Sequence, residues 1–252
     1  MSTQDWSRKL LDRLERNELR LGVIGLGYVG LPLACEFARA GIDVTGVDVS
    51  KEKVALVNAG KSYIGDIDDA AVAELVGAGN LRATTDFSVI RELDALSICV
   101  PTPLRKSKDP DISFVVDAMA EVAKYAHPGL LVVLESTTYP GTTAELIIPR
   151  LEEQGLVVGE DVFVAYSPER VDPGNLSHNT HNTPKVIGGH TQTCGDLAQA
   201  LYERAVTKVV RVASPAAAEM VKLLENTFRA VNIGLVNEFA IMCDRLDLDV
   251  WD

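Results

Sequence analysis

The sequence predicts an α/β fold in which a doubly wound, mostly parallel sheet is followed by a long helix. Apolar, β-rich runs alternate with segments of helical periodicity along most of the 252 residues. The runs lack polar alternation, which is typical of strands covered by helices on both faces. A glycine-rich turn after the first run and a long apolar-periodic stretch after Ser214 complete the pattern.

The elements follow one another along the chain in strand–helix order. A charged amphipathic segment predicts a short helix over residues 5–17, before the first strand. Further helices are expected over residues 29–40 and 51–60. The expected strands are residues 21–25, 43–48, 94–100, 130–136, 161–166, 185–189 and 208–212. We therefore expect one α/β domain over residues 1–213, with right-handed connections between its parallel strands.

The chain changes character at Ser214, where a Ser-Pro pair is typical of a helix N-terminus. Apolar residues then recur at helical spacing for over thirty residues without another proline. A helix this long exceeds the usual length in globular proteins, so we expect it to connect domains or to form an oligomer interface. No C-cap signal precedes Asp252. We interpret residues 214–252 as the start of a second domain, and the chain as part of a longer protein.

Charge and composition argue against several classes of partner. The net charge is −12 and the isoelectric point is near 4.8, whereas nucleic acid and acidic membrane surfaces bind basic faces. No apolar run reaches the roughly 18 residues of a membrane span. The N-terminus lacks the apolar core of a signal peptide, so we expect a cytoplasmic protein. A small anionic ligand remains compatible with this charge.

The cysteines predict neither a metal site nor a disulfide framework. Cys35, Cys99, Cys194 and Cys243 are scattered, and no two of them form a CxxC pair. Zinc sites and small disulfide-rich domains both depend on closely spaced cysteines.

The motif GLGYVG at residues 25–30 is GxGxxG, placed between the first expected strand and the next helix. Such a motif can be a plain strand–helix turn, but the following strand also ends in an acidic residue, Asp48. In the Rossmann fold, Gly25 would allow the tight turn, Gly27 the approach of a pyrophosphate, and Gly30 close helix–strand packing. Asp48 would accept hydrogen bonds from the adenosine ribose and repel a 2′-phosphate. The motif therefore predicts NAD binding.

Two further polar stretches follow expected strands. In VPTP (100–103), Thr102 could contact the cofactor, or the prolines could simply form a turn. In ESTTYPGTT (135–143), Thr137 is better placed to face the crevice, while Thr142 or Thr143 could cap a helix. The carboxyl ends of strands are where α/β proteins bind ligands.

The stretch YSPERVDPGN puts Glu169 beside Arg170 where a buried strand is expected to end. The chain is then expected to break at Pro173–Gly174. This pair is either a solvated loop or part of a catalytic site, because strand ends that feed loops often carry chemistry.

Lys222, Asn226 and Arg229 lie at i, i+4 and i+7 in the long helix and therefore share one face. The ordinary interpretation is a solvated stripe. Their neighbours are Val221, Leu224 and Phe228, and a lysine beside buried apolar surface can have a lowered pKa. These residues remain candidates for function.

Five motifs in this order, GLGYVG, VPTP, ESTTYPGTT, SPER and EMVKLLEN, make residues 20–252 resemble the nucleotide-sugar 6-dehydrogenases. The resemblance implies an NAD-binding domain, a central helical dimerisation domain and a UDP-sugar-binding domain. It also implies oxidation of a sugar C6 alcohol to a carboxylate by two NAD. SPERVDPG resembles the SPERxxPG of the UDP-N-acetylglucosamine and UDP-N-acetylmannosamine branch, rather than the SPEFLxEG of the UDP-glucose branch; PDISFV and PGTT agree.

The resemblance implies roles by matching position. The residues that would bind the cofactor are Gly25, Gly27, Tyr28, Val29, Gly30, Asp48, Lys53, Thr102 and Thr137. Those that would bind the substrate are Arg170, Val171, Lys222, Asn226 and Arg229. The implied catalytic set is Lys222, Glu169, Asn226 and Thr137. In that set Lys222 acts as acid–base and stabilises negative charge on O6, and Glu169 assists hydrolysis of an enzyme thioester.

The nucleophilic cysteine of the resembled family lies in a GGxC motif, which this sequence lacks. A cysteine thiolate would form the thiohemiacetal from which the second hydride leaves more easily. The C-terminal UDP-binding domain is also missing, so the chain is expected to bind NAD without being a complete enzyme. The alternatives are UDP-glucose 6-dehydrogenase, a non-catalytic NAD-binding regulatory module, and an oligomer built on the long helix. The implied setting is surface-polysaccharide precursor synthesis by a homodimer.

Overall fold

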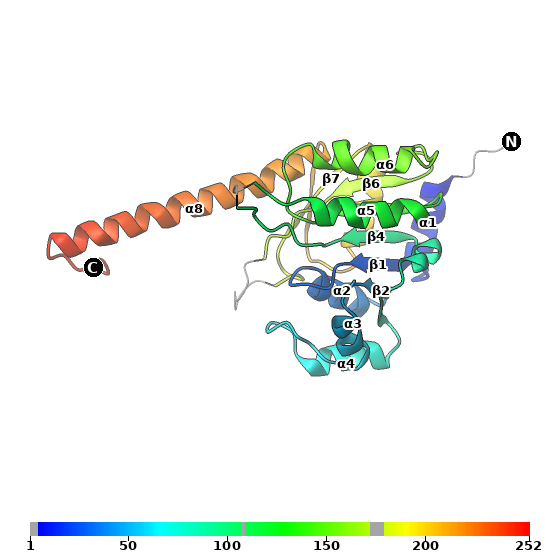
Figure 1. Cartoon of the computed structure of the whole chain (residues 1–252), viewed down its shortest axis with the longest axis horizontal. Helices are drawn as coiled ribbons and strands as arrows, with labels where there is room; N and C mark the ends of the chain where they lie inside the picture. The colour runs from blue at the N-terminus through cyan, green and yellow to red at the C-terminus, as the bar shows by residue number, and fades with distance from the viewer. Residues whose placement is uncertain (1–4, 107–108, 172–178) are drawn as a thin grey trace.

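The computed structural model describes residues 5–106, 109–171 and 179–252. The predicted break at Pro173–Gly174 and part of the loop after VPTP lie outside these residues. Two α-helical layers enclose a central sheet, and one long helix leaves this body and projects away from it (Figure 1). Within the described residues, no helix combines the length and the apolar character needed to cross a membrane.

One eight-stranded sheet forms the centre of the fold. Its strands are β1 (Arg20–Ile24), β2 (Asp43–Val47), β3 (Leu81–Thr84), β4 (Ala95–Ile98), β5 (Leu131–Leu134), β6 (Phe163–Tyr166), β7 (Lys185–Gly189) and β8 (Val209–Val212). Their spatial order is β3-β2-β1-β4-β5-β6-β7-β8, and the first six are parallel. The order 3-2-1-4-5-6 is that of dinucleotide-binding folds. The predicted doubly wound, mostly parallel sheet is therefore confirmed.

Helices cover both faces of the sheet. They are α1 (Trp6–Glu15), α2 (Gly30–Arg39), α3 (Lys51–Asn58), α4 (Asp69–Gly77), α5 (Ser113–Tyr125), α6 (Ile148–Glu152), α7 (Gln192–Tyr202) and α8 (Pro215–Arg245), with a 3₁₀ turn η1 (Phe87–Glu92) and a π-helical turn η2 (Thr143–Ile147). One hydrophobic core lies under α1, α2, α4 and α7. The other lies under α5 and α6. Buried apolar side chains of the strands alternate between the two cores, as expected for a sheet covered on both faces.

Side-chain caps explain where several helices begin. The Ser50 hydroxyl accepts a hydrogen bond from the N–H of Lys53 at 3.3 Å, and Thr191 does the same for Cys194 at 3.2 Å. Ser214 caps α8 through the N–H of Ala217 at 3.2 Å. Each cap satisfies a backbone donor that has no partner within its helix.

The prediction missed β3, which is a short edge strand. Only Leu81 and Ala83 of its four residues are buried, while Arg82 is exposed and pairs with Asp43 of β2. A four-residue alternation is too short to distinguish from a loop, whereas the neighbouring buried strands read as continuous apolar runs.

The prediction that Thr142 or Thr143 caps a helix is wrong. Thr142 instead donates its hydroxyl hydrogen to the carbonyl of Tyr139 at 2.6 Å. The buried carboxylate of Glu219 on α8 accepts the N–H of Gly141 at 2.6 Å, and the N–H and hydroxyl of Thr143 at 2.9 and 2.7 Å. A carboxylate from a distant helix therefore satisfies the start of η2 and fixes the first turns of α8 on the body.

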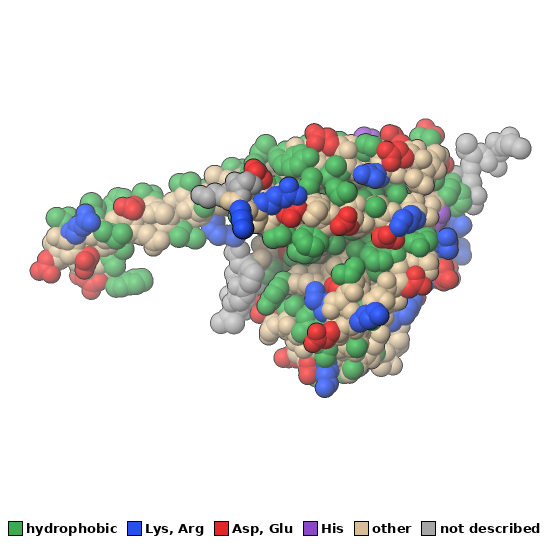
Figure 2. All heavy atoms as spheres, in the orientation of Figure 1, with side chains coloured by type: hydrophobic (Ala, Val, Ile, Leu, Met, Phe, Trp, Pro, Cys, Tyr) green, Lys and Arg blue, Asp and Glu red, His purple; other side chains and the backbone are tan. Residues whose placement is uncertain are grey.

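The long helix is confirmed, but it ends before Asp252. It spans 31 residues, and Asp247 after it adopts a left-handed backbone conformation with φ of 57°. The N–H of Leu248 then donates to the carbonyl of Cys243 at 3.0 Å. Glycine is the usual residue in this cap, so an aspartate gave no sequence signal. Hydrophobic side chains lie along the projecting part of α8 (Figure 2).

Candidate functional site

Three of the predicted cofactor residues, Gly25, Asp48 and Lys53, line a groove of about 690 Å³ at the carboxyl ends of β1 and β2. Open α/β sheets bind their ligands at the carboxyl ends of the strands, and the volume of the groove suits a small molecule. The residues that line the groove are Ile24, Gly25, Val47, Asp48, Val49, Lys53, Phe87, Val100, Pro101, Phe114, Asp117, Ala118, Ala120 and Glu121.

The glycine turn has the geometry that a pyrophosphate requires. Gly25 adopts a φ of 89°, and a side chain at Gly30 would place Cβ 1.9 Å from the carbonyl oxygen of Gly25. A Cβ at Gly27 would meet nothing within 4 Å, so this backbone faces open space. No side chain caps α2, which leaves its N-terminal amides available to an anion. The turn therefore fits a dinucleotide.

Two backbone amides and Lys53 hold the Asp48 carboxylate at the end of β2. One carboxylate oxygen accepts the N–H of Leu26 and the other the N–H of Ser50, both at 2.8 Å, and Lys53 Nζ lies 3.4 Å away. Asp117 and Glu121 add two more carboxylates to the groove. An acidic lining of this kind suits ribose hydroxyls and disfavours an additional phosphate, so the residues fit NAD.

The first prediction concerns cofactor choice. The chain is expected to bind NAD more tightly than NADP, because a phosphate against the Asp48 carboxylate costs roughly a few kcal/mol. Asp48→Ala should narrow the difference between the two affinities. Calorimetric titration of both variants with NAD and NADP measures it, and Asp66→Ala, an exposed aspartate, is the control. Equal affinity of the unaltered chain for both cofactors would contradict the role of Asp48.

The remaining predicted cofactor residues also lie at this edge. Tyr28 is exposed and Val29 half-buried at the glycine turn. Thr102 is half-buried beyond β4, and Thr137 is exposed beyond β5. Their contacts with a cofactor remain predictions.

A buried ionic cluster, which the sequence analysis missed, lies at the carboxyl ends of β5 and β6. We call it the strand-end cluster; it consists of Ser97, Glu135, Glu169, Lys185 and Tyr202. Lys185 Nζ lies 2.6 Å from a carboxylate oxygen of Glu135 and 3.0 Å from one of Glu169. The Tyr202 hydroxyl donates to Glu135 and lies 3.0 Å from the Ser97 hydroxyl. The lysine side chain is 3% exposed.

The direction of β7 explains this cluster. β7 is antiparallel to β6, with Tyr166 opposite Gly188, so β7 begins at the edge where the parallel strands end. Continued for three more residues, the same register places Lys185 opposite Glu169. A sequence signal did exist, because two glutamates follow neighbouring buried strands and would need a cation. The strand direction that supplies the cation was not predictable.

Burial and ion pairing together shift the pKa values of Glu169, Glu135 and Lys185. Burial raises the pKa of Glu169, but Lys185 and the N–H groups of Val171 and Arg170 outweigh it and hold this pKa below its ordinary value. Burial raises the pKa of Glu135 above its ordinary value, in spite of Lys185. Burial would lower the pKa of Lys185, but the two carboxylates hold it above its ordinary value. At neutral pH, Lys185 is therefore charged and Glu169 ionised.

The structure brings Glu169 and Lys222 together. Lys222 Nζ donates to the backbone carbonyl of Glu169 at 2.6 Å. The Glu169 carboxylate accepts the N–H groups of Arg170 and Val171 at 2.6 and 2.7 Å. The strand end and the long helix, 53 residues apart in sequence, thus form one site.

Hydrogen bonds to α8 and to the segment before β7 orient the Arg170 side chain. Its Nε donates to the carboxylate of Glu225 at 2.9 and 3.0 Å, and one Nη donates to the carbonyl of Pro184 at 2.7 Å. Asn226 and Arg229 are exposed further along α8. Substrate contacts by these residues and by Val171 remain predictions.

The expected apolar surroundings of Lys222 are found only in part, because Val221 beside it packs against the core under α5 and α6. Leu224 and Phe228, in contrast, are 66% and 69% exposed. Two residues that the sequence analysis did not select, Glu219 and Glu225, bind the loop after β5 and Arg170 instead.

Cys35 and Cys99 are poor nucleophiles. Burial raises the pKa of Cys35 to about 11 and that of Cys99 well above its ordinary value, and a protonated thiol is weakly nucleophilic. Across the described ranges, no group of three or more His, Cys, Asp or Glu side chains is arranged to hold a metal ion.

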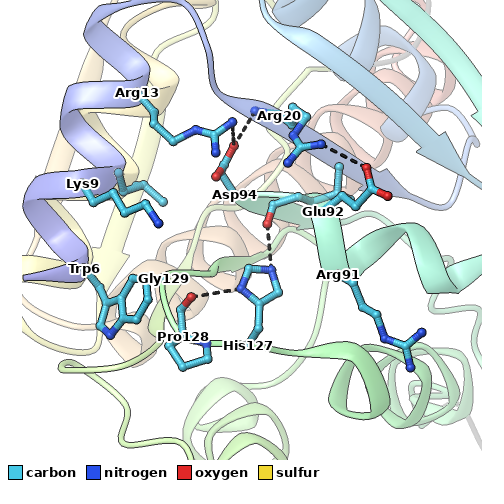
Figure 3. A pocket seen from close by; sticks show the side chains of 12 residues that line it. Trp6, Lys9, Arg13, Arg20, Arg91, Glu92, Asp94, His127, Pro128 and Gly129 are labelled. Atoms are coloured by element: carbon cyan, nitrogen blue, oxygen red, sulfur yellow. Dashed lines mark hydrogen bonds and ion pairs between the residues drawn. The ribbon is translucent and has the colours of Figure 1, made fainter. Parts of the chain in front are cut away.

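A second hollow, of about 370 Å³, lies at the opposite end of the strands, beside the amino ends of β1 and β4 (Figure 3). Asp94 there accepts the N–H of Arg20 at 2.8 Å and lies 3.1 Å from an Nη of Arg13 on α1. His127 has both ring nitrogens 3.0 Å from backbone carbonyls. None of the predicted site residues lines this hollow, and its ion pairs attach α1 to the sheet.

The chain is similar to known proteins along nearly its whole length. The family description "UDP-glucose/GDP-mannose dehydrogenase family, NAD binding domain" matches residues 19–206, and the central domain of that family matches residues 216–252. UDP-N-acetyl-D-mannosamine dehydrogenase of Pyrococcus horikoshii is 39% identical over 93% of the chain and 56% of its own length. UDP-N-acetyl-D-glucosamine 6-dehydrogenase of Pseudomonas aeruginosa is 38% identical over 92% and 54%.

A solved structure, that of the UDP-D-ManNAc dehydrogenase of Pyrococcus horikoshii, has the same fold. It superimposes with a TM-score of 0.87 at 38% identity, over 92% of this chain and 56% of the other. The chain thus spans about half the length of the relatives that it matches. It belongs to the UDP-glucose/GDP-mannose dehydrogenase family and contains the NAD-binding domain of that family.

Proposed function

We propose that this chain is the NAD-binding part of an enzyme that oxidises the C6 alcohol of a UDP-N-acetylhexosamine to the uronic acid. The contact between Lys222 and Glu169, at the same sheet edge as the cofactor groove, is the observation that supports this most. A non-catalytic dinucleotide-binding module would not need both Lys222 and the largely buried Glu169 at the carboxyl ends of its strands. The relatives named above act on UDP-N-acetylmannosamine and UDP-N-acetylglucosamine, by their names.

The proposed chemistry has two oxidations and one hydrolysis. NAD, when bound, accepts the hydride that leaves C6 in each oxidation. Lys222 takes the proton of the C6 hydroxyl and then stabilises the negative charge that develops on O6. Asn226, one turn further along α8, would hold the same oxygen, and Thr137 would face it from the end of β5.

A cysteine outside this chain would bind the aldehyde as a thiohemiacetal, and the second oxidation would convert this to a thioester. Water then attacks the thioester carbonyl carbon, and the carbon–sulfur bond breaks to release the thiolate and the carboxylic acid. Glu169 would accept the proton of that water. Its low pKa, caused by Lys185 and the neighbouring backbone amides, keeps it ionised and ready to do so.

We also propose the organisation of the longer protein. Residues 1–213 would form its NAD-binding domain and residues 214–252 the start of its central dimerisation domain. α8 supports this, because its exposed apolar side chains are suited to a second copy of the chain. These side chains include Leu223, Leu224, Phe228, Val231, Leu235, Val236 and Phe239. A cytoplasmic enzyme that prepares precursors of surface polysaccharides is the setting that we infer.

Turnover of a panel of UDP-sugars by the full-length protein tests the proposed function. UDP-N-acetylglucosamine or UDP-N-acetylmannosamine should be oxidised, with two NADH formed for each sugar. The isolated 252-residue chain is the control and should form no NADH, because it lacks the GGxC cysteine. Turnover of UDP-glucose alone would favour the other branch, against which SPERVDPG argues.

A further inference from the structure

We propose that Lys185 is a positioning residue, which holds the Glu169 carboxylate in the place and charge state that thioester hydrolysis requires. This inference rests on the proposed function, in which Glu169 is the base. Nothing in the motifs points to Lys185; its position follows from the antiparallel direction of β7.

Lys185 is the cation that allows two buried glutamates to share one site. Its Nζ lies 2.6 Å from Glu135 and 3.0 Å from Glu169, whose side chains are 0% and 14% exposed. Two neighbouring buried carboxylates without a cation cannot both stay ionised, because each raises the pKa of the other. Removing Lys185 should therefore leave a proton on one of them.

The two carboxylates have different roles in this arrangement. Glu135 is fully enclosed and also accepts the hydroxyl hydrogen of Tyr202, so it serves to orient the lysine. Glu169 is the one that reaches the surface of the site, and one of its oxygens already accepts two backbone N–H groups. Lys185 holds the other oxygen. Both oxygens of Glu169 are thus fixed, while its side chain remains 14% exposed.

The two lysines act on different parts of Glu169. Lys222 donates to its backbone carbonyl at 2.6 Å, and Lys185 to its carboxylate at 3.0 Å. This separation predicts that the lysines affect different steps: Lys222 the oxidations and Lys185 the hydrolysis. Among the described residues, the charged and titratable groups around Glu169 include Cys99 beyond β4, Glu135 beyond β5, Tyr202 on α7, Lys185 on β7, Lys222 and Glu225 on α8, and Arg170 beside it. Lys185 is paired directly with the Glu169 carboxylate at 3.0 Å.

The test is the pH dependence of turnover by the full-length protein with Lys185→Met and Lys185→Arg. In Lys185→Met, Glu169 loses its cation. Its pKa should rise, and the acidic limb of the kcat profile should move upward by about one pH unit or more. On the acidic limb, more than one pH unit below the midpoint of the unaltered enzyme, kcat should fall about tenfold, while the affinity for NAD stays the same. Lys185→Arg should restore most of the unaltered profile.

Mass spectrometry adds a second readout that a merely structural role would not change. Lys185→Met, incubated with substrate and NAD below the shifted midpoint, should accumulate sugar attached to protein as the thioester. Raising the pH should release it. Glu169→Gln should accumulate the same adduct at every pH, because an amide cannot accept the proton.

The outcomes separate this inference from the proposed function. If Glu169→Gln turns over normally without an adduct, Glu169 is not the base and the proposed mechanism fails. If Glu169→Gln stalls but folded Lys185→Met keeps the unaltered profile, only the role of Lys185 is overturned. Should Lys185→Met not fold, Lys185→Gln takes its place. If neither folds, Lys185 has a structural role and the inference is rejected.

Discussion

Replacing Lys222 with alanine in the full-length enzyme is expected to lower kcat by about 10²–10³-fold, with little change in KM. The loss is large because Lys222 would stabilise charge that exists on O6 only during the oxidations, and would also take the proton. The amine is already oriented by the Glu169 carbonyl at 2.6 Å, so the alanine variant loses a preorganised group. Steady-state NADH formation at saturating substrate measures the effect.

Lys208→Ala is the control for the Lys222→Ala variant. Lys208 is exposed immediately before β8, and Lys208→Ala should keep normal kcat and KM. If Lys222→Ala raises KM and leaves kcat unchanged, Lys222 binds the substrate without taking part in the chemistry. Normal values of both would mean that the face formed by Lys222, Asn226 and Arg229 is a solvated stripe.

Glu219→Ala is expected to lower the free energy of unfolding of the chain by about 2–5 kcal/mol. The carboxylate is fully buried and accepts three hydrogen bonds, from the N–H of Gly141 and from the N–H and hydroxyl of Thr143. Alanine would leave these donors without an acceptor and would open a cavity between α8 and η2.

Urea denaturation followed by circular dichroism measures the change. The free energy of unfolding of Glu219→Gln should lie between those of the unaltered chain and Glu219→Ala. An amide oxygen can still accept from Thr143, whereas the amide nitrogen opposes the N–H of Gly141. Glu238→Ala, exposed on the same helix, should alter stability by less than about 0.5 kcal/mol. If Glu219→Ala resembled Glu238→Ala, the carboxylate would not be what fixes α8 to the body.

The alternation of strands and helices and the glycine turn were predictable because their signals are local. A strand buried on both faces appears as an apolar run, and a helix appears as a 3.6-residue period. The turn at Gly25 needs a left-handed backbone at a set distance from a strand and a helix, which the motif records directly. The acidic residue at the end of β2 has a fixed place in the same unit, so Asp48 could be assigned with the glycines.

Local patterns in the sequence were therefore enough to predict the fold class, the long helix, the nucleotide-binding turn and the family that the motifs resemble. Three features could not be predicted in this way: the antiparallel direction of β7, the position of Lys185 between Glu135 and Glu169, and the capping of η2 by Glu219. The reason is the separation of the partners: 50 residues divide Lys185 from Glu135, and 76 divide Glu219 from Thr143. Periodicity describes what a segment buries, but it contains no information about which distant side chain will satisfy a buried charge. That choice is made when the strands and helices pack.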